Sequence, residues 1–166
     1  EVLEELLIEE EGFKDDFQLC FAGKVSEEIE EELHQRGLTA YYKNMGYITH
    51  MEAISLQKKS QVLLLIEIDS EDTRGIIAGK LFEYMVSGRP IIAMGPKEWD
   101  VIPILTETQT GVFVDYNGKE RLKTMLKTYY KQYKEGLLKV TPIGIEHYSR
   151  RALTKRLAQL ILNSKI

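Results

Sequence analysis

The sequence predicts a single α/β domain, in which a parallel sheet is covered by helices on both faces. Apolar runs of strand length alternate with amphipathic helical segments along most of the 166 residues. The connections between these segments are short, and several contain glycine or proline. Strand–helix alternation favours a parallel sheet because parallel strands must be joined by a crossover, which is usually a helix.

Each element has a local reason in the sequence. Five strands are expected from apolar runs, at residues 18–22, 38–42, 62–68, 90–94 and 111–115. Helices are expected at residues 1–11, 26 to about 36, 50 to about 58, 80–88, 101–107, 117–134 and 149–162. Ser26 is the expected N-cap of the Glu-rich second helix, and Gly37 ends that helix. The dipeptide Gly95-Pro96 marks a turn after the fourth strand.

Composition excludes several classes of protein. The net charge of −4 disfavours a general role in nucleic-acid binding. No apolar run approaches the length of about 20 residues that a membrane span needs. Cys20 is the one cysteine, so an intrachain disulfide is excluded, and we expect it to be a small core residue in a reducing, cytoplasmic compartment. The three histidines have no metal-ligand spacing, so no metal site is predicted.

The stretch at residues 73–93 contains the strongest candidate for chemistry. It follows the apolar run at 62–66, continues through Gly79 and Lys80 into a short helix, and stops at a Gly-Arg-Pro turn. Such a loop delivers a helix N-terminus to the carboxyl edge of a parallel sheet, where anions bind. Lys80 is a cation at the positive end of the helix dipole, a conflict that a bound diphosphate would remove. We expect backbone N–H groups around Gly79, Lys80 and Leu81 to contact that diphosphate.

Glu83 lies one helical turn beyond Lys80 on the same face. Its carboxylate can accept hydrogen bonds from vicinal ribose hydroxyls, although a simple surface ion pair with Lys80 explains the spacing as well. A phosphate-binding loop of the Walker type is disfavoured, because the glycines of Gly75-Ile-Ile-Ala-Gly79 have three residues between them and Leu81 replaces the Ser or Thr that binds Mg²⁺.

The segment Gly79-Lys-Leu-Phe-Glu-Tyr-Met-Val-Ser-Gly-Arg-Pro90 resembles the donor site of family 4, or group 1, glycosyltransferases of the GT-B fold. The order of elements over residues 17–162 is similar to the C-terminal, donor-binding domain of that family. The resemblance implies a Rossmann-like fold and retaining transfer from a nucleoside-diphosphate sugar. It also implies that Lys80 stabilises the leaving diphosphate and that Glu83 binds ribose, with no cofactor and no metal ion.

The sequence departs from that family in three respects. The family carries an acid eight positions before Glu83, where this chain has Gly75. Backbone N–H groups of residues 75–77 (Gly75, Ile76 and Ile77), or the loop acids Glu71 or Asp72, would then have to contact the donor sugar. The family's first strand and its basic loop are missing. The acceptor domain is also missing, so the chain is expected to be cut from a longer two-domain protein and to catalyse no transfer alone.

Two further loops are candidate donor contacts. Gly23 and Lys24 follow the first predicted strand, where glycine permits close approach of a phosphate; an ordinary strand-end turn explains them equally well. Tyr47 and Ile48 follow the second predicted strand, where the resemblance implies contacts to the nucleobase. His50 is interpreted as a capping or surface residue.

The resemblance also implies the partners and the location of the full protein. The partners are the nucleotide-sugar donor and an N-terminal acceptor domain. The basic helix at residues 149–162 leaves open a peripheral association with the inner face of a membrane. Two other functions stay open from the sequence. One is a nucleotide-sugar epimerase of GT-B architecture, and the other is a non-catalytic flavodoxin-like or receiver domain, although a receiver would need acids after its first strand.

Overall fold

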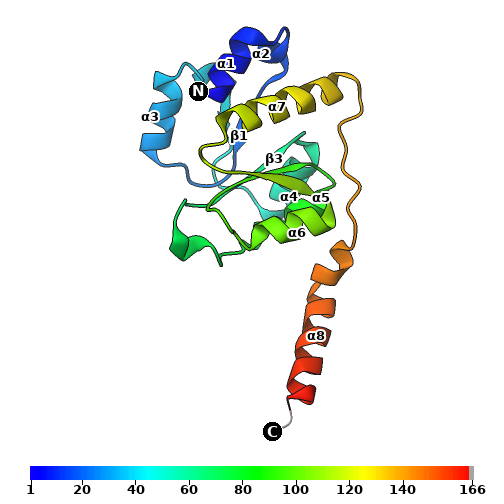
Figure 1. Cartoon of the computed structure of the whole chain (residues 1–166). Coiled ribbons are helices and arrows are strands. Elements are labelled where there is room, and N and C mark those ends of the chain that lie inside the picture. The colour runs from blue at the N-terminus through cyan, green and yellow to red at the C-terminus, as the bar shows by residue number, and fades with distance from the viewer. Residues whose placement is uncertain (165–166) are drawn as a thin grey trace. The chain divides into compact units, whose positions relative to one another are not determined.

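A computed structural model describes residues 1–164 of the chain, and its contacts divide them into two compact units. Unit 1 comprises Glu1–Lys59 and Asn117–Leu138. Unit 2 comprises Ser60–Tyr116 and the residues from Lys139 onward (Figure 1). That the two units act as one domain stays a prediction.

Unit 1 combines a small parallel sheet with helices. Its elements are α1 (Val2–Glu9), α2 (Phe13–Asp16), β1 (Leu19–Phe21), α3 (Glu27–Gln35), the 3₁₀ turn η1 (Thr39–Tyr41), β2 (Tyr42–Asn44), α4 (His50–Lys59) and α7 (Lys119–Lys134). Strands β1 and β2 pair in parallel, with Leu19 opposite Tyr42. The apolar face of α1 buries Val2 and Leu6 against α7, which lies beside it in Figure 1. This packing holds the two ends of the unit together.

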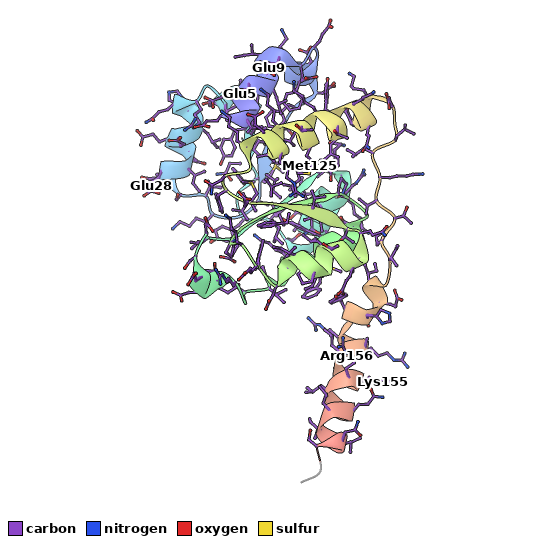
Figure 2. All side chains as sticks on the ribbon, viewed as in Figure 1. Glu5, Glu9, Glu28, Met125, Lys155 and Arg156 are labelled. Carbon is purple, nitrogen blue, oxygen red and sulfur yellow. The ribbon has the colours of Figure 1, made fainter. Side chains whose placement is uncertain are left out.

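Ion pairs border the contact between α1 and α7. Lys119 and Lys123 approach Glu5 to 2.6 and 2.7 Å, and Lys123 also contacts Glu9 at 2.7 Å. Figure 2 labels Glu5 and Glu9 on α1. Hydrogen bonds from Lys119 and then Lys123 lower the pKa of Glu5 to about 2. Lys123 and Glu5 are partly buried, with side chains 15% and 31% exposed, whereas Lys119 and Glu9 are more exposed. Salt still reaches the pairs, so each contributes modestly to stability.

Unit 2 is built on a three-stranded parallel sheet. Its elements are β3 (Leu63–Ile66), the 3₁₀ turn η2 (Glu71–Thr73), α5 (Lys80–Ser87), β4 (Ile91–Met94), α6 (Val101–Thr108), β5 (Gly111–Val114), the 3₁₀ turn η3 (Ile145–Tyr148) and α8 (Arg150–Asn163). The strand order is β3-β4-β5, with Leu65 opposite Ala93 and Ala93 opposite Phe113.

One hydrophobic core joins this sheet to two helices. Its buried members come from β3, α5, β4, the following turn and α6: Leu65, Leu81, Met85, Ile91, Ala93, Trp99, Val101, Ile104 and Leu105. Helix α5 buries Leu81 and Met85 at i, i+4 spacing, and Gly88 ends the helix at φ +73°. The core therefore fixes where α5 begins relative to the end of β3.

The predicted fold class is confirmed: parallel strands alternate with helices that flank them. The expected single sheet is wrong in one respect, since the strands of the described residues form two sheets, β1-β2 and β3-β4-β5. Strand order depends on contacts that are distant in sequence, so alternation alone does not determine it.

The second strand begins later than predicted, at Tyr42 rather than at residue 38. The N–H of Leu38 donates to the Leu33 carbonyl at 2.9 Å, and the N–H of Gly37 donates to the His34 carbonyl at 3.0 Å. These bonds form a Schellman motif at the end of α3, in which Leu38 is the buried apolar residue after the glycine. Leu38 is therefore buried as part of a helix end and not as part of a strand.

The expectation that Cys20 is a core residue is wrong. Its side chain is half-buried, and the thiol donates to Gln18 Oε1 at 3.3 Å. All three residues of β1 are only partly buried, because this short strand belongs to a two-stranded sheet. A sheet of that size covers its side chains incompletely.

Candidate functional site

The predicted phosphate site lies at the start of α5, and the helix begins at Lys80 as expected. The chain leaves β3 at Ile66 and passes through η2 before it reaches Gly79. We call residues 74–79 the glycine loop. The loop and the first turn of α5 both belong to unit 2, so the structure describes them together.

Consecutive backbone donors are available there. The first turn of α5 is closed by Leu81 N–H to the Ala78 carbonyl, at 3.0 Å, and Phe82 N–H to the Gly79 carbonyl, at 3.2 Å. Within residues 1–164, the N–H groups at positions 77–80 donate to no acceptor. Unpaired donors of this kind are expected at a helix N-terminus, and an anion can accept hydrogen bonds from them.

Gly79 leaves open space beside these donors. A Cβ built at this position would meet no atom within 4 Å, and the backbone has ordinary helical angles, φ −55° and ψ −30°. Neither packing nor backbone strain therefore requires a glycine at position 79. A glycine at this position does allow a ligand to approach the backbone closely.

The charged residues of the site are exposed. The Lys80 ammonium makes no hydrogen bond or ion pair in the part of the chain that the structure describes. Glu83 lies on the exposed side of the same helix, in its first turn. Leu81 differs from them, because its side chain is fully buried and its N–H is already bonded to Ala78. Leu81 is therefore a core residue, and the available donors lie one position earlier.

The remaining residues of the glycine loop have different surroundings. Gly75, Ile76 and Ile77 are exposed, although the N–H of Ile76 donates to the Thr73 carbonyl at 3.0 Å. Glu71, one of the acids expected to replace the family's missing glutamate, pairs with Arg74 at 3.0 Å. The N–H groups of the later loop residues are thus better placed for an anion than that of Ile76.

The second predicted group lies in unit 1. The N–H of Gly23 donates to the Gly46 carbonyl at 2.7 Å, so the loops after β1 and β2 meet at one sheet edge. Gly23 has φ +110°, a conformation that favours glycine, and Lys24 beside it is exposed. Tyr47 is 87% exposed and Ile48 is half-buried. Their contact with a nucleotide stays a prediction.

Two features were missed by reasoning from the sequence. Thr49 and Glu52 form a capping box at the start of α4, in which the Thr49 N–H donates to Glu52 Oε2 at 2.7 Å. The Thr-x-x-Glu spacing in the sequence could have predicted this motif. The second feature is the turn after β4, residues 98–100, which we call the tryptophan turn. Its Trp99 is buried and donates Nε1–H to the Ile76 carbonyl at 2.7 Å.

The described residues offer neither a cluster of metal ligands nor a membrane-spanning helix. Among residues 1–164, no group of three or more His, Cys, Asp or Glu side chains could hold a metal ion. Of the helices described, none is long and apolar enough to cross a bilayer.

Comparisons with known proteins bear on the fold of the chain. No protein family model matches the chain, and no curated protein matches it significantly. Among solved structures, the chain is similar to the crystal structure of WaaG, a glycosyltransferase involved in lipopolysaccharide biosynthesis, with a TM-score of 0.61 and 16% sequence identity. The match covers 82% of this chain but 35% of WaaG. The chain therefore has a glycosyltransferase-like α/β fold and spans about a third of that relative's length.

Proposed function

We propose that this chain is the donor-binding part of a glycosyltransferase. Its ligand would be a nucleoside-diphosphate sugar, whose glycosyl group passes to an acceptor. The observation that carries the proposal is the run of backbone N–H groups at positions 77–80 without acceptors in the described chain, next to Lys80. It occurs at the start of a helix that follows a parallel strand, in a glycosyltransferase-like fold.

The diphosphate would bind across the first turn of α5. Its oxygens accept hydrogen bonds from the unpaired N–H groups, and the positive end of the helix dipole adds to the attraction. Lys80 contributes a charge-assisted hydrogen bond. Glu83, one turn further along, accepts hydrogen bonds from the ribose hydroxyls.

The same contacts would assist the reaction. The bond between the sugar's anomeric carbon and the diphosphate oxygen breaks, and its electron pair stays with the diphosphate. Negative charge therefore grows where Lys80 and the backbone dipoles are fixed, so these groups stabilise the transition state more than the bound substrate. A hydroxyl oxygen of the acceptor forms the new bond to the anomeric carbon, and the hydroxyl proton passes to the departing diphosphate. By analogy with family 4 enzymes the sugar is transferred with retention. This scheme draws its positive charge from the protein and uses no metal ion.

The acceptor would be held by an N-terminal domain of the same longer protein, so the present chain alone should transfer no sugar. Helix α8 carries Lys155 and Arg156, which project from it in Figure 2, and also the exposed apolar residues Leu157 and Ile161. This combination is suited to the surface of an anionic membrane. We propose a cytoplasmic protein that associates peripherally with the inner face of a membrane.

A thermal-shift screen of nucleoside diphosphates and their sugars tests the proposal. A ligand that binds the native state raises the melting temperature by mass action. We expect at least one nucleoside diphosphate to raise it in a saturable way, and the matching nucleoside to have little effect. No shift with any nucleoside diphosphate at millimolar concentration would reject the proposed function. Release of an epimerised nucleotide sugar without an acceptor would favour an epimerase.

A further inference from the structure

The tryptophan turn contacts the glycine loop through each of its three residues. The indole Nε1–H of Trp99 donates to the Ile76 carbonyl at 2.7 Å. The N–H of Asp100 donates to the Arg74 carbonyl at 2.9 Å, and the Glu98 carboxylate lies 3.1 Å from the Arg74 guanidinium. Both backbone carbonyls belong to the glycine loop just before its unpaired N–H groups. The turn is therefore attached directly to the segment that precedes the phosphate site.

Trp99 joins this loop to the rigid core of unit 2. Its side chain is 1% exposed and packs in the same cluster as Leu65 and Leu81. A Cβ at Gly95 would lie 2.8 Å from the indole Cε3, so the ring occupies the space that glycine leaves. The Nε1–H, the one polar group of the indole, donates a hydrogen bond to the Ile76 carbonyl of the loop. Movement of the loop at Ile76 therefore leaves a buried donor unpaired, which is costly.

The ion pairs at Arg74 are weaker attachments. The guanidinium contacts Glu71 at 3.0 Å and Glu98 at 3.1 Å, but these acids are 86% and 79% exposed. Exposed ion pairs contribute little because water and salt screen them. The Arg74 Nε is buried and lacks a hydrogen-bond partner among the described residues, so the guanidinium is also incompletely satisfied. The two hydrogen bonds from Trp99 and Asp100 are thus the main restraints.

We propose that Trp99 is a positioning residue for the phosphate site. Its indole N–H holds the Ile76 carbonyl, and the N–H of Asp100 holds the Arg74 carbonyl. These two hydrogen bonds fix the glycine loop so that the N–H groups at positions 77–80 stay open to an anion. Trp99 contacts no ligand in this account. The inference rests on the proposed function, since it assigns the tryptophan turn a role in binding the diphosphate at the start of α5.

The test compares the variant Trp99→Phe with a matched core variant, Ile104→Val. Phenylalanine keeps an aromatic ring but lacks the N–H donor. Ile104 is 7% exposed in the same cluster, and its hydrocarbon side chain forms no hydrogen bond to the loop. Hydrogen exchange of the Ile76 and Asp100 amides reports on the loop, because both amides are hydrogen-bonded at 3.0 and 2.9 Å. UDP or GDP, whichever binds the wild type, reports on the site.

A second variant protects the test if Trp99→Phe folds poorly. Asp100→Pro removes the N–H that bonds the Arg74 carbonyl, and the φ of −60° at Asp100 suits proline just before α6. We expect exchange at Ile76 to become about five- to tenfold faster in either variant, and the dissociation constant of the diphosphate to rise by a similar factor. The variant Ile104→Val should change neither beyond its effect on global unfolding.

Several results would overturn the inference. Unchanged exchange at Ile76 in both variants would mean that the turn does not hold the loop. Faster exchange with unchanged diphosphate affinity would mean that the loop is held for stability alone, and Trp99 would have no positioning role. If the wild-type chain binds no nucleoside diphosphate, the proposed function fails and the positioning role fails with it. The exchange data then show separately whether the turn restrains the loop.

Discussion

The substitution Lys80→Ala separates binding from folding at the start of α5. Lys80 is exposed, and its ammonium makes no hydrogen bond or ion pair with another described residue, so its removal breaks no polar interaction of the fold. A cation at a helix N-terminus also opposes the helix dipole. We therefore expect the free energy of unfolding to change by less than about 0.5 kcal/mol, or to rise slightly.

The expected loss of affinity is much larger. A hydrogen bond to a charged group contributes about 1.5–3 kcal/mol, which corresponds to roughly a tenfold to hundredfold change in dissociation constant. Calorimetric titration of UDP, GDP and the matching nucleosides into both proteins measures the change. The diphosphates should lose affinity by that factor and the nucleosides should not. Lys97→Ala, which removes another exposed lysine of unit 2, is the control and should bind as the wild type does.

Two results would refute this reasoning. An equal loss of affinity for the nucleoside and the diphosphate would show that Lys80 does not act on the phosphates. A melting temperature lowered by the equivalent of several kcal/mol would show that Lys80 supports the fold, and the loss of binding would then be indirect.

Four other substitutions test separate parts of the structure. Glu83→Gln should weaken ribonucleoside diphosphates more than their 2′-deoxy analogues in the same titration, whereas equal weakening would exclude a ribose contact. Gly111→Ala places a Cβ 2.3 Å from the Ile91 carbonyl oxygen and should lower the free energy of unfolding by about 1–3 kcal/mol in chemical denaturation. Gly79→Ala has open space around its Cβ, so it should change that free energy by less than about 0.5 kcal/mol while weakening diphosphate binding. The pKa of Glu5 is about 2 in the folded chain, against an ordinary value of 4.5, so its ion pairs stabilise the fold above pH 4.5. The melting temperature should therefore fall as the pH drops from 4.5 towards 2, and Lys123→Gln should reduce this fall. An identical pH profile in that variant would exclude a contribution of the Lys123–Glu5 pair.

The elements around α5 were predictable because their signals are local. The apolar run before the loop, the helical spacing of Leu81 and Met85, and the final Gly88 each specify one feature of the segment. The start of α5 at Lys80 follows from those signals. The absence of any packing demand for glycine at position 79 could not be predicted, because it depends on which atoms lie near that backbone.

Features that depend on distant residues were not predictable. The run from Leu38 has an alternating apolar pattern, but hydrogen bonds to α3 make its first residue part of a helix end. The pairing of β1 with β2 alone leaves Cys20 partly exposed, although its sequence neighbours suggest a core strand. Trp99 and Ile76 lie 23 positions apart, so neither local sequence predicts the hydrogen bond between them.

The proposed function requires that a diphosphate binds at the start of α5. Amide chemical shifts of the wild-type chain, recorded during titration with the nucleoside diphosphate that binds, test this directly. We predict that the amides of Gly79 and Lys80 shift most within unit 2, that they saturate with the same dissociation constant as the calorimetric signal, and that the matching nucleoside leaves them unchanged. Saturable binding that leaves both amides unshifted would show that the diphosphate does not bind at the start of α5.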